Sequence, residues 1–473
     1  MAQPAGTVDS ASGTVDRGSG QKDGGFVREL GLLDSTMIVA GSMIGSGIFI
    51  VSADIARRLP APGWLLLVWT LAGLLTIAGA WSYGVLAAAM PRAGGQYAYL
   101  AELYGPLAGF LYGWTLVLVI QTGTIAAVAV AFAKFNGVFF PDLPVQAVAV
   151  AAILLLTAIN VRGLEAGRRV QNAFTATKVL TLLGVIALGV VFGDPAVRAA
   201  NLAAPFAIGV GPADALPLLG AAMVGALFSS TAWPNVTFTA AETRDPRRTV
   251  GRALVLGTSL VCALYVATNV AYLNVLPLSG NPDGAGVAAR GIQHATADRV
   301  GTAVVEQIAG AGWGPRLMAI AVMISTFGCA NGLVLAGARV AWAMAGDGFF
   351  PAAVRRLNAR RVPGVALWLQ GAWASLLALS GRYGDLLDYV VIAELLFYLL
   401  AVGGLFLLAR RTGTAPRGVA YPWLQVAYVA AVLVLVITLL ITKPAYTWGS
   451  VAVVLSGLPV YFVLRGRTRA VSA

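Results

Sequence analysis

The chain has 473 residues, of which 58% are hydrophobic and only 11% are charged. A soluble domain carries roughly a quarter charged residues, and a disordered chain combines low hydrophobicity with high net charge, so the composition excludes both. The formal net charge of +12 would suit nucleic acid, but the basic residues lie between long apolar runs. We therefore expect an integral membrane protein without a nucleic-acid partner.

The residue types that enzymes need are scarce. His294 is the only histidine, which makes His-pair metal sites and Ser-His-Asp triads hard to build. None of the four lysines follows a glycine, which excludes the Gly-Lys of a phosphate-binding Walker loop. Cys262 and Cys329 lie in apolar runs and are expected to pack as small hydrophobes. The sequence thus predicts neither an enzyme nor a bound cofactor or metal.

Residues 1–30 are predicted to be a disordered cytoplasmic tail, because they begin with a polar stretch that lacks the apolar core of a signal peptide. From Asp34 onward, apolar stretches recur that reach the ~20 residues needed to cross a ~30 Å hydrocarbon layer. We expect about twelve spans, at approximately 34–58, 63–90, 104–134, 144–162, 169–192, 216–241, 250–276, 313–345, 363–380, 385–409, 420–441 and 446–464.

An even number of spans places both termini on one side of the membrane, and most basic residues in the loops fall on that side. The positive-inside rule therefore predicts a cell-membrane protein with both termini in the cytoplasm. The longest outer loop, 277–312, contains an amphipathic stretch from Thr296 to Ile308 that is too short to span. We expect this stretch to form a lid helix over the outer face.

The first span carries Gly41, Gly45 and Gly47 near its middle. Each glycine costs about 1 kcal/mol in a helix interior, so this helix is predisposed to break. Broken backbone at membrane depth is tolerated where it lines a cavity, and the new helix N-terminus would favour a carboxylate. The alternative is close helix packing through small residues.

The sixth span offers a second break between Phe228 and Asn235, where Pro234 removes a backbone donor and clashes with the preceding turn. Corresponding breaks in two halves of a chain are typical of inverted-repeat transporters, which hold substrate between the breaks at the midplane. The alternative is a simple kink, repaired by the hydroxyl groups of Ser229, Ser230 and Thr231.

Several separated motifs closely resemble the amino acid-polyamine-organocation superfamily, and within it the L-type amino acid transporters and their bacterial relatives. The resemblance covers about residues 30–410 in matching order. The motifs are Gly45-Ser46-Gly47-Ile48-Phe49, Pro62-Gly63-Trp64, the run from Met90 to Tyr99, Val170-Gln171-Asn172-Ala173-Phe174, Glu242-Thr243-Arg244-Asp245-Pro246-Arg247-Arg248 and Phe327-Gly328-Cys329-Ala330-Asn331-Gly332.

The resemblance implies an all-α membrane fold of five plus five inverted helices, in which helices 1 and 6 are broken. The core would cover 31–410, with a first half at about 31–193 and a second half at about 214–410. Residues 411–473 would supply two peripheral helices and a short cytoplasmic C-terminus. The implied activity is transport of amino acids by alternating access.

Carried over residue by residue, the resemblance places the substrate carboxylate on the amides of Ser46 and Gly47. The substrate ammonium would meet the carbonyls of Met43, Phe228 and Thr231, with the Phe228 ring as the outer gate. The implied substrate-binding set is Met43, Ile44, Gly45, Ser46, Gly47, Phe228, Ser229, Thr231 and Trp233.

Three departures from the family pattern matter. Thr231 and Ala232 stand where relatives often have two glycines, which should shrink the side-chain pocket. Relatives often carry a glutamate in span two, where this chain has Val85, so an inner network using that acid is in doubt. Animal members bond a cysteine between spans three and four to a partner glycoprotein, whereas this chain reads Phe140-Pro141-Asp142-Leu143-Pro144 there, so no covalent heavy-chain partner is expected.

Lys178 and Glu394 are ionisable groups within spans, where buried charge is costly and function is the default expectation. Lys178 lies about ten residues past Arg168, roughly half the hydrocarbon thickness. In the resembling family this lysine replaces a sodium ion and ties span five to spans one and eight, where Ser325 and Thr326 would be neighbours. The alternative, a structural charge paired with carbonyls, is compatible with that role.

Glu394 has no equivalent in the family motifs, and three interpretations stay open. It could carry a proton, contact a polar or cationic substrate side chain, or face a water-filled vestibule. As coupling and gating residues we therefore list Lys178, Phe228, Ser325, Thr326 and Glu394.

The sequence as a whole predicts a secondary active transporter of amino acids, with neutral L-amino acids as the expected substrates. Its partners would be the substrate, the lipid bilayer and, in a symporter, protons. Sodium-independent proton symport and amino acid exchange both remain open. The alternatives are a non-transporting amino acid sensor of the same fold and a cationic amino acid or polyamine permease that uses Glu394.

Overall fold

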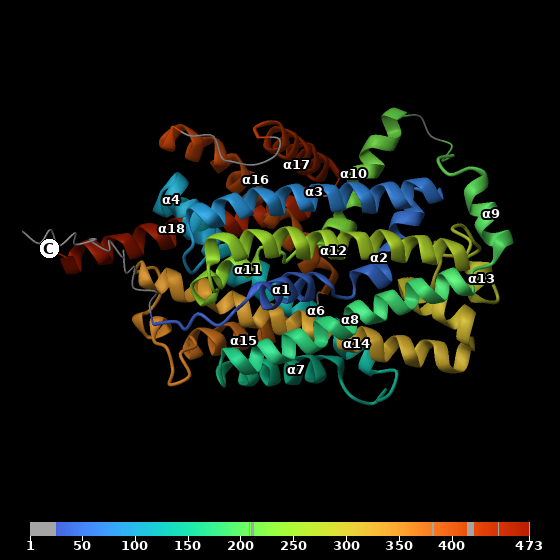
Figure 1. The fold of residues 1–473 in the computed structure, drawn as a ribbon, viewed down its shortest axis with the longest axis horizontal. Coiled ribbons are helices and arrows are strands. Elements are labelled where there is room, and N and C mark those ends of the chain that lie inside the picture. Colours follow the sequence, from blue (N-terminus) through green and yellow to red (C-terminus); the bar gives the residue numbers. More distant parts are fainter. Residues whose placement is uncertain are drawn as a thin grey trace, which may run out of the picture.

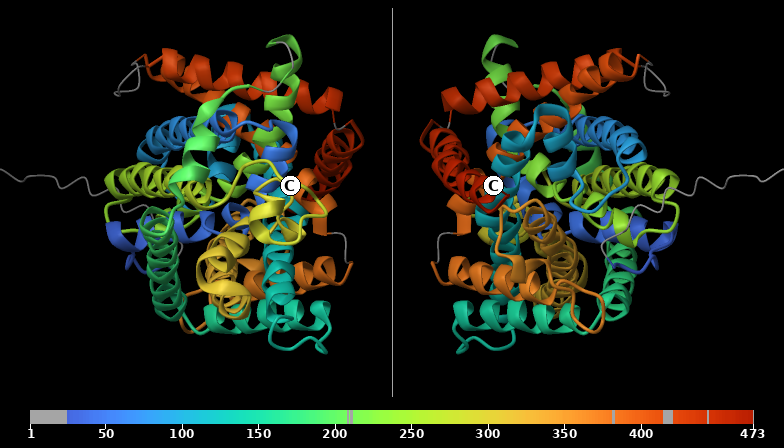
Figure 2. Two further views of the ribbon diagram at one scale, coloured as in Figure 1. Left: turned by 90° about the vertical axis from the view of Figure 1, so that its right-hand side faces the viewer. Right: turned by 90° about the vertical axis from the view of Figure 1, so that its left-hand side faces the viewer.

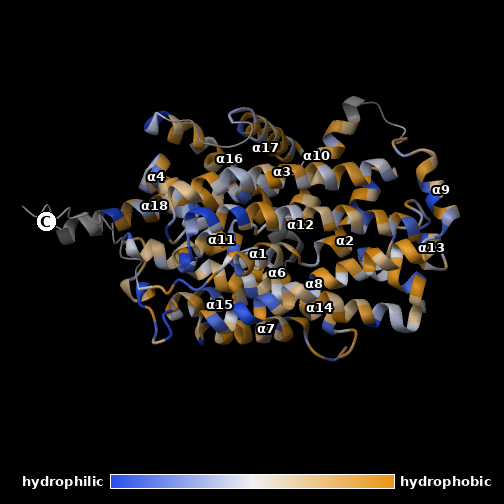
Figure 3. Cartoon of the chain, viewed as in Figure 1, coloured by the Kyte–Doolittle hydropathy of each residue, from blue (hydrophilic) through white to orange (hydrophobic). Residues whose placement is uncertain are grey.

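The computed structural model describes residues 25–207, 209, 212–380, 383–413, 421–442 and 444–472. Its regular elements are helices, and many of the long ones run roughly along the long axis of the molecule (Figure 1). The end-on views show the helices surrounding one another in a bundle (Figure 2). Apolar residues dominate along the helices, and polar residues gather at both ends of the bundle (Figure 3).

Eight helical segments in the described residues are long and apolar enough to cross a membrane. They are α3 (Pro62–Ala89), the continuous segment of α5 (Pro106–Thr115), η1 (Leu116–Ile120) and α6 (Gln121–Asn136), α8 (Leu164–Val191), α12 (Pro246–Val275), α14 (Val300–Gly346), α16 (Tyr383–Thr412), α17 (Trp423–Thr442) and α18 (Pro444–Ser472).

The remaining predicted spans are shorter or broken. A ninth span is formed by α1 (Leu32–Met43) and α2 (Gly47–Arg58), which are bent by 43° relative to each other. Three shorter apolar helices complete the set, namely α7 (Val145–Val161), α10 (Pro212–Ser229) and α15 (Gly364–Leu379). These segments account for the expected spans of about twelve helices, so the all-α membrane fold is confirmed.

Short elements connect the spans. They are α4 (Gln96–Tyr104), α9 (Pro195–Ala203), α11 (Asn235–Phe238), η2 (Ala240–Glu242), α13 (Val287–Arg290), η3 (Thr296–Asp298) and η4 (Ala352–Arg355). The stretch expected to be a lid helix is partly a 3-10 turn, and its helical part begins at Val300. The non-helical Gly310, with φ 81°, separates that part from the following span.

The predicted disordered tail of residues 1–30 overlaps the described part of the chain at residues 25–30. Residues 1–24 lie outside the described part of the chain, but Phe26 and Leu30 are buried. The Arg244 amide donates to the Leu30 carbonyl over 2.9 Å, and Leu30 forms an isolated bridge with Thr243. Burial of these two apolar side chains explains why the segment is held against the bundle.

The two broken helices lie inside the bundle. Helix α1 packs against α8, α12 and α14, while α2 packs against α10. In contrast, α17 and α18 expose large apolar side chains such as Trp423, Ile441 and Phe462, which suits helices that face lipid. The fold thus surrounds the interrupted backbone with helices on several sides.

Candidate functional site

The first break spans Ile44, Gly45 and Ser46. Helix α1 ends when the Ile44 amide donates to the Ala40 carbonyl over 2.9 Å, and Ile44 itself is extended. Helix α2 then begins at Gly47, with Ser46 as its N-cap. Amides in the first turn of a helix have no intrahelical partner, so this N-terminus presents donors suited to an anion.

The second break lies between Ser229, the last residue of α10, and Asn235, the first residue of α11. Within it, Ala232 adopts a left-handed φ of 67°, a conformation that costs a non-glycine residue about 1–2 kcal/mol. Pro234 follows as the N-cap of α11, where its missing N–H is not needed.

The two breaks touch each other. A Cβ built on Gly47 would lie 2.1 Å from the Ser229 hydroxyl oxygen and 3.1 Å from the Ser229 Cα. Only glycine permits this approach, so protein packing by itself requires glycine at position 47, whether or not a ligand also approaches the backbone there. Tyr265 of α12 joins both breaks, because its hydroxyl lies 3.1 Å from the Met43 carbonyl and 3.0 Å from the Ser229 carbonyl.

Tyr265 was missed by the sequence reasoning. It sits in an apolar span with no charged neighbour or motif, so only the packing reveals its role. It is buried and lies edge-on to the Trp69 ring at 5.3 Å between centroids. A hydroxyl group has a single hydrogen to donate, so Tyr265 is shared between the Met43 and Ser229 carbonyls of the two breaks.

Lys178 of α8 binds the C-terminal end of α1. Its ammonium group donates to the Gly41 carbonyl over 2.7 Å and to the Ile44 carbonyl over 2.8 Å. The side chain is only 1% exposed. The lysine therefore satisfies carbonyls that the break removes from the helix.

Helix α14 supplies further donors to the same break. The Ser325 hydroxyl lies 3.2 Å from the Ile44 carbonyl and 3.0 Å from the Gly45 carbonyl, and the Cys329 thiol lies 3.0 Å from the Ser42 carbonyl. The Thr326 hydroxyl instead bonds within its own helix. Of the two predicted neighbours of Lys178 in α14, Ser325 is the one that donates to the break.

On the other side of the second break, Thr231 and Ser230 line a small cavity with Glu394 of α16. Glu394 is 8% exposed, and its Oε2 atom has no hydrogen-bond partner among the described residues. Trp233 packs between Tyr83 and Tyr398, at 4.7 and 5.2 Å between ring centroids. The structure thus brings Glu394 beside the unwound segment, which the sequence did not predict.

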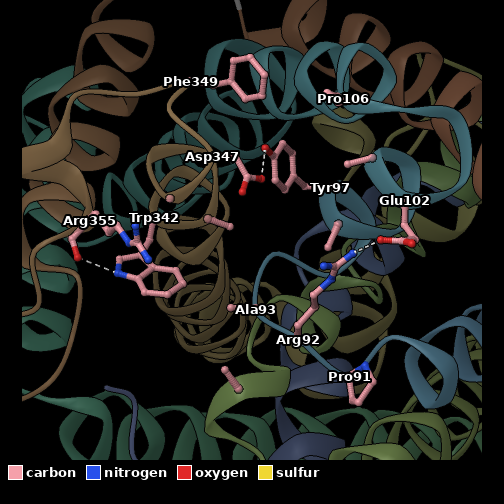
Figure 4. A pocket seen from close by; sticks show the side chains of 15 residues that line it. Pro91, Arg92, Ala93, Tyr97, Glu102, Pro106, Trp342, Asp347, Phe349 and Arg355 are labelled. Atoms are coloured by element: carbon pink, nitrogen blue, oxygen red, sulfur yellow. Dashed lines mark hydrogen bonds and ion pairs between the residues drawn. The ribbon is translucent and has the colours of Figure 1, made fainter. Parts of the chain in front are cut away.

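A larger cavity of about 670 Å³ opens at the end of the bundle that carries α4 and the η4 segment. Figure 4 shows its side chains: Arg92 pairs with Glu102 over 2.7 Å, and the Tyr97 hydroxyl donates to the Asp347 carboxylate over 2.7 Å. Burial, together with this hydrogen bond to Asp347, raises the pKa of Tyr97, so its hydroxyl remains a donor. We call this cavity the vestibule; its wall combines these polar side chains with apolar ones such as Trp342 and Phe349.

A buried ion pair connects η2, in the segment after the second break, to α14 close to this vestibule. Arg339 donates from Nε and Nη2 to the two carboxylate oxygens of Glu242, each over 2.8 Å, and both side chains are 2% exposed or less. The Glu242 carbonyl also accepts from the amides of Glu29 and Leu30. The sequence motif contained Glu242, but Arg339 lies about 100 residues further on, so its partnership could not be read from spacing.

Two interrupted helices that meet inside a bundle of membrane spans, with a vestibule at one end, are typical of membrane transporters with broken helices. The comparison with known families gives the particular family. The amino acid permease family model matches residues 30–464. The chain therefore belongs to the amino acid permease family of the amino acid-polyamine-organocation superfamily, as the sequence motifs indicated.

The relatives are named as transporters. The chain is 29% identical over 454 residues to the large neutral amino acids transporter small subunit 2 of Oryctolagus cuniculus, covering 92% of this chain and 80% of that one. It is 28% identical over 455 residues to the serine/threonine exchanger SteT of Bacillus subtilis, covering 94% and 99%. It is 27% identical over 445 residues to the b(0,+)-type amino acid transporter 1 of Mus musculus, covering 92% and 88%.

Proposed function

We propose that this protein is a secondary active transporter of neutral L-amino acids that works without sodium, by alternating access. The observation that carries the proposal is the contact between two buried helix breaks, which offers unpaired amides from one half and carbonyls from the other. The protein would lie in the cell membrane with both termini in the cytoplasm, because most arginines and lysines of the loops are on the same side of the membrane as the termini.

The substrate carboxylate would bind the amides of Ser46 and Gly47, the first donors of α2. The substrate ammonium would bind the carbonyls of Met43, Phe228 and Thr231. The Phe228 carbonyl already accepts from the Thr231 amide and, over 2.8 Å, from the Thr231 hydroxyl. Binding would therefore require the Thr231 hydroxyl to rotate away, which links substrate entry to this threonine.

Access to the site would alternate between the two sides. The half-buried Phe228 ring would close it from outside, with Ser229 and Trp233 in the adjoining unwound segment. The vestibule beside Arg92 and Asp347 would open towards the cytoplasm. The Glu242–Arg339 pair would hold the segment after the second break to α14 as the halves rearrange.

Sodium independence is supported by Lys178, whose ammonium group occupies the carbonyl oxygens at the first break that a bound cation would otherwise use. Neutral substrates are supported by the small residues around the breaks and by the names of two relatives, a large neutral amino acid transporter and a serine/threonine exchanger. The segment between α6 and α7, residues 137–144, contains no cysteine, which supports the absence of a covalent heavy-chain partner.

The test uses the purified full chain in two assays. A thermal-shift panel of amino acids in detergent should show stabilisation by L-serine and L-alanine, and weaker stabilisation by L-lysine and L-tryptophan. Proteoliposomes should then take up labelled L-serine in sodium-free buffer. Binding without uptake would support a sensor of the same fold, and the absence of both would reject the proposal.

A further inference from the structure

The cavity shared by Glu394, Ser230 and Thr231 is the feature that the transport scheme leaves unused. It lies between α3, α10, α16 and α17 and has a volume of about 20 Å³. A water molecule needs roughly 10–15 Å³ of such space and two to four polar partners. The cavity therefore has room for about one water molecule and excludes a guanidinium or lysine side chain.

The volume decides between two of the interpretations of Glu394. A subsite for a cationic substrate side chain would need several times this space next to the carboxylate. A single water needs only partners, and the cavity wall offers the Glu394 carboxyl together with the hydroxyl-bearing side chains Thr76, Ser230, Thr231 and Tyr428. The geometry thus favours a proton, bound by the carboxyl group together with one water molecule, over a cationic substrate side chain.

The ionisable groups around Glu394 also favour a proton-binding site. The ionisable side chains nearest to the carboxyl group are tyrosines. Tyr398 of α16 and Tyr428 of α17 line the cavity, Tyr83 of α3 and Tyr112 of α5 lie close enough to interact electrostatically with Glu394, and Tyr99 of α4 packs behind Tyr83. Among the described residues, no lysine or arginine lines the cavity. An unpaired buried carboxylate is costly, and binding a proton removes that cost.

The carboxyl group is also connected to the unwound backbone. Tyr398, one turn further along α16, lines the cavity together with Glu394, and its ring packs on Trp233 at the second break. Thr231 lines the cavity and belongs to the break itself. A change in the proton state of Glu394 would alter the hydrogen bonds open to Thr231, the residue that must rotate when substrate binds.

We propose that Glu394 and one water molecule form a proton-binding site beside the second break, and that its proton is co-transported with the amino acid. The carboxylate takes up one proton from the outer side and releases it to the cytoplasm, and no bond of the substrate changes. The inference deepens the proposed function and rests on it, because it selects proton symport as the mode of coupling.

The test measures accumulation of labelled L-serine in proteoliposomes at an inward proton gradient of about two pH units. For one proton per substrate this gradient can support up to about a hundredfold accumulation, since each pH unit is worth a factor of ten. Wild-type protein should accumulate L-serine at least tenfold, whereas Glu394→Gln should only equalise the concentrations. Glu394→Asp, which keeps a carboxyl group, should retain pH-driven accumulation. Glu165→Gln removes an exposed carboxylate of α8 and should behave as wild type.

The outcomes separate this inference from the proposed function. Monodisperse Glu394→Gln that still accumulates L-serine like wild type would overturn it. So would a wild type that exchanges L-serine across the membrane but ignores the pH gradient, a result that leaves amino acid transport intact. A wild type that moves no amino acid would overturn the transport proposal and this inference with it. A Glu394→Gln variant that loses only competition by L-lysine would show a cationic subsite instead.

Discussion

Replacing Lys178 with methionine tests the link between α8 and the first break. The substitution keeps most of the stem and removes the ammonium group, which leaves the carbonyls of Gly41 and Ile44 without their donor. A hydrogen bond to a charged group contributes about 1.5–3 kcal/mol, so two of them suggest about 3–6 kcal/mol. Removing a buried charge relieves desolvation and offsets part of this loss, leaving a net effect of about 2–4 kcal/mol.

If the arrangement that couples α1 to α8 loses about 2 kcal/mol or more of stabilising free energy, its population falls at least roughly thirtyfold, because about 1.4 kcal/mol is a factor of ten. We expect the initial rate of L-serine uptake by Lys178→Met proteoliposomes to fall by that factor, while L-serine still stabilises the protein in detergent. Lys134→Met, at an exposed position in the last turn of α6, is the matched control. Uptake by Lys178→Met at the normal rate, or wild-type uptake that needs sodium, would refute the reasoning.

Three further predictions concern the breaks. Gly47→Leu should abolish L-serine binding, because its side chain would fill the contact between the breaks; unchanged affinity in monodisperse protein would contradict this. Thr231→Gly with Ala232→Gly should improve competition by L-leucine and L-tryptophan about tenfold, since one methylene is worth about 1–3 kcal/mol; wild-type protein in which these compete as well as L-serine would show that the pocket is not restricted. Arg339→Met leaves Glu242 as an unpaired buried charge, at a cost of about 3–5 kcal/mol, so Tm in detergent should fall by several degrees; an unchanged Tm would argue against a stabilising pair.

The two breaks could be predicted from the sequence because their causes are local. Glycine weakens a helix wherever it stands, and Pro234 removes a donor whatever surrounds it. The depth of Lys178 followed from counting residues along one helix. These features needed no knowledge of which helix packs against which.

The rest of the site depends on contacts between distant segments. Tyr265 is one of fourteen tyrosines, and only packing shows that its hydroxyl reaches carbonyls of both breaks. The contact of Gly47 with Ser229 likewise joins residues about 180 positions apart. The position of Glu394 beside Thr231 depends on the packing of α16 against α10, which hydropathy does not encode.

Counterflow into proteoliposomes tests the transport claim most directly. Vesicles loaded with unlabelled L-serine and empty vesicles are placed in sodium-free buffer with a trace of labelled L-serine and no pH gradient. The alternating-access scheme predicts rapid, transient uptake of label into the loaded vesicles, well above that of empty vesicles and of protein-free liposomes. Equal uptake by loaded and protein-free vesicles would contradict it.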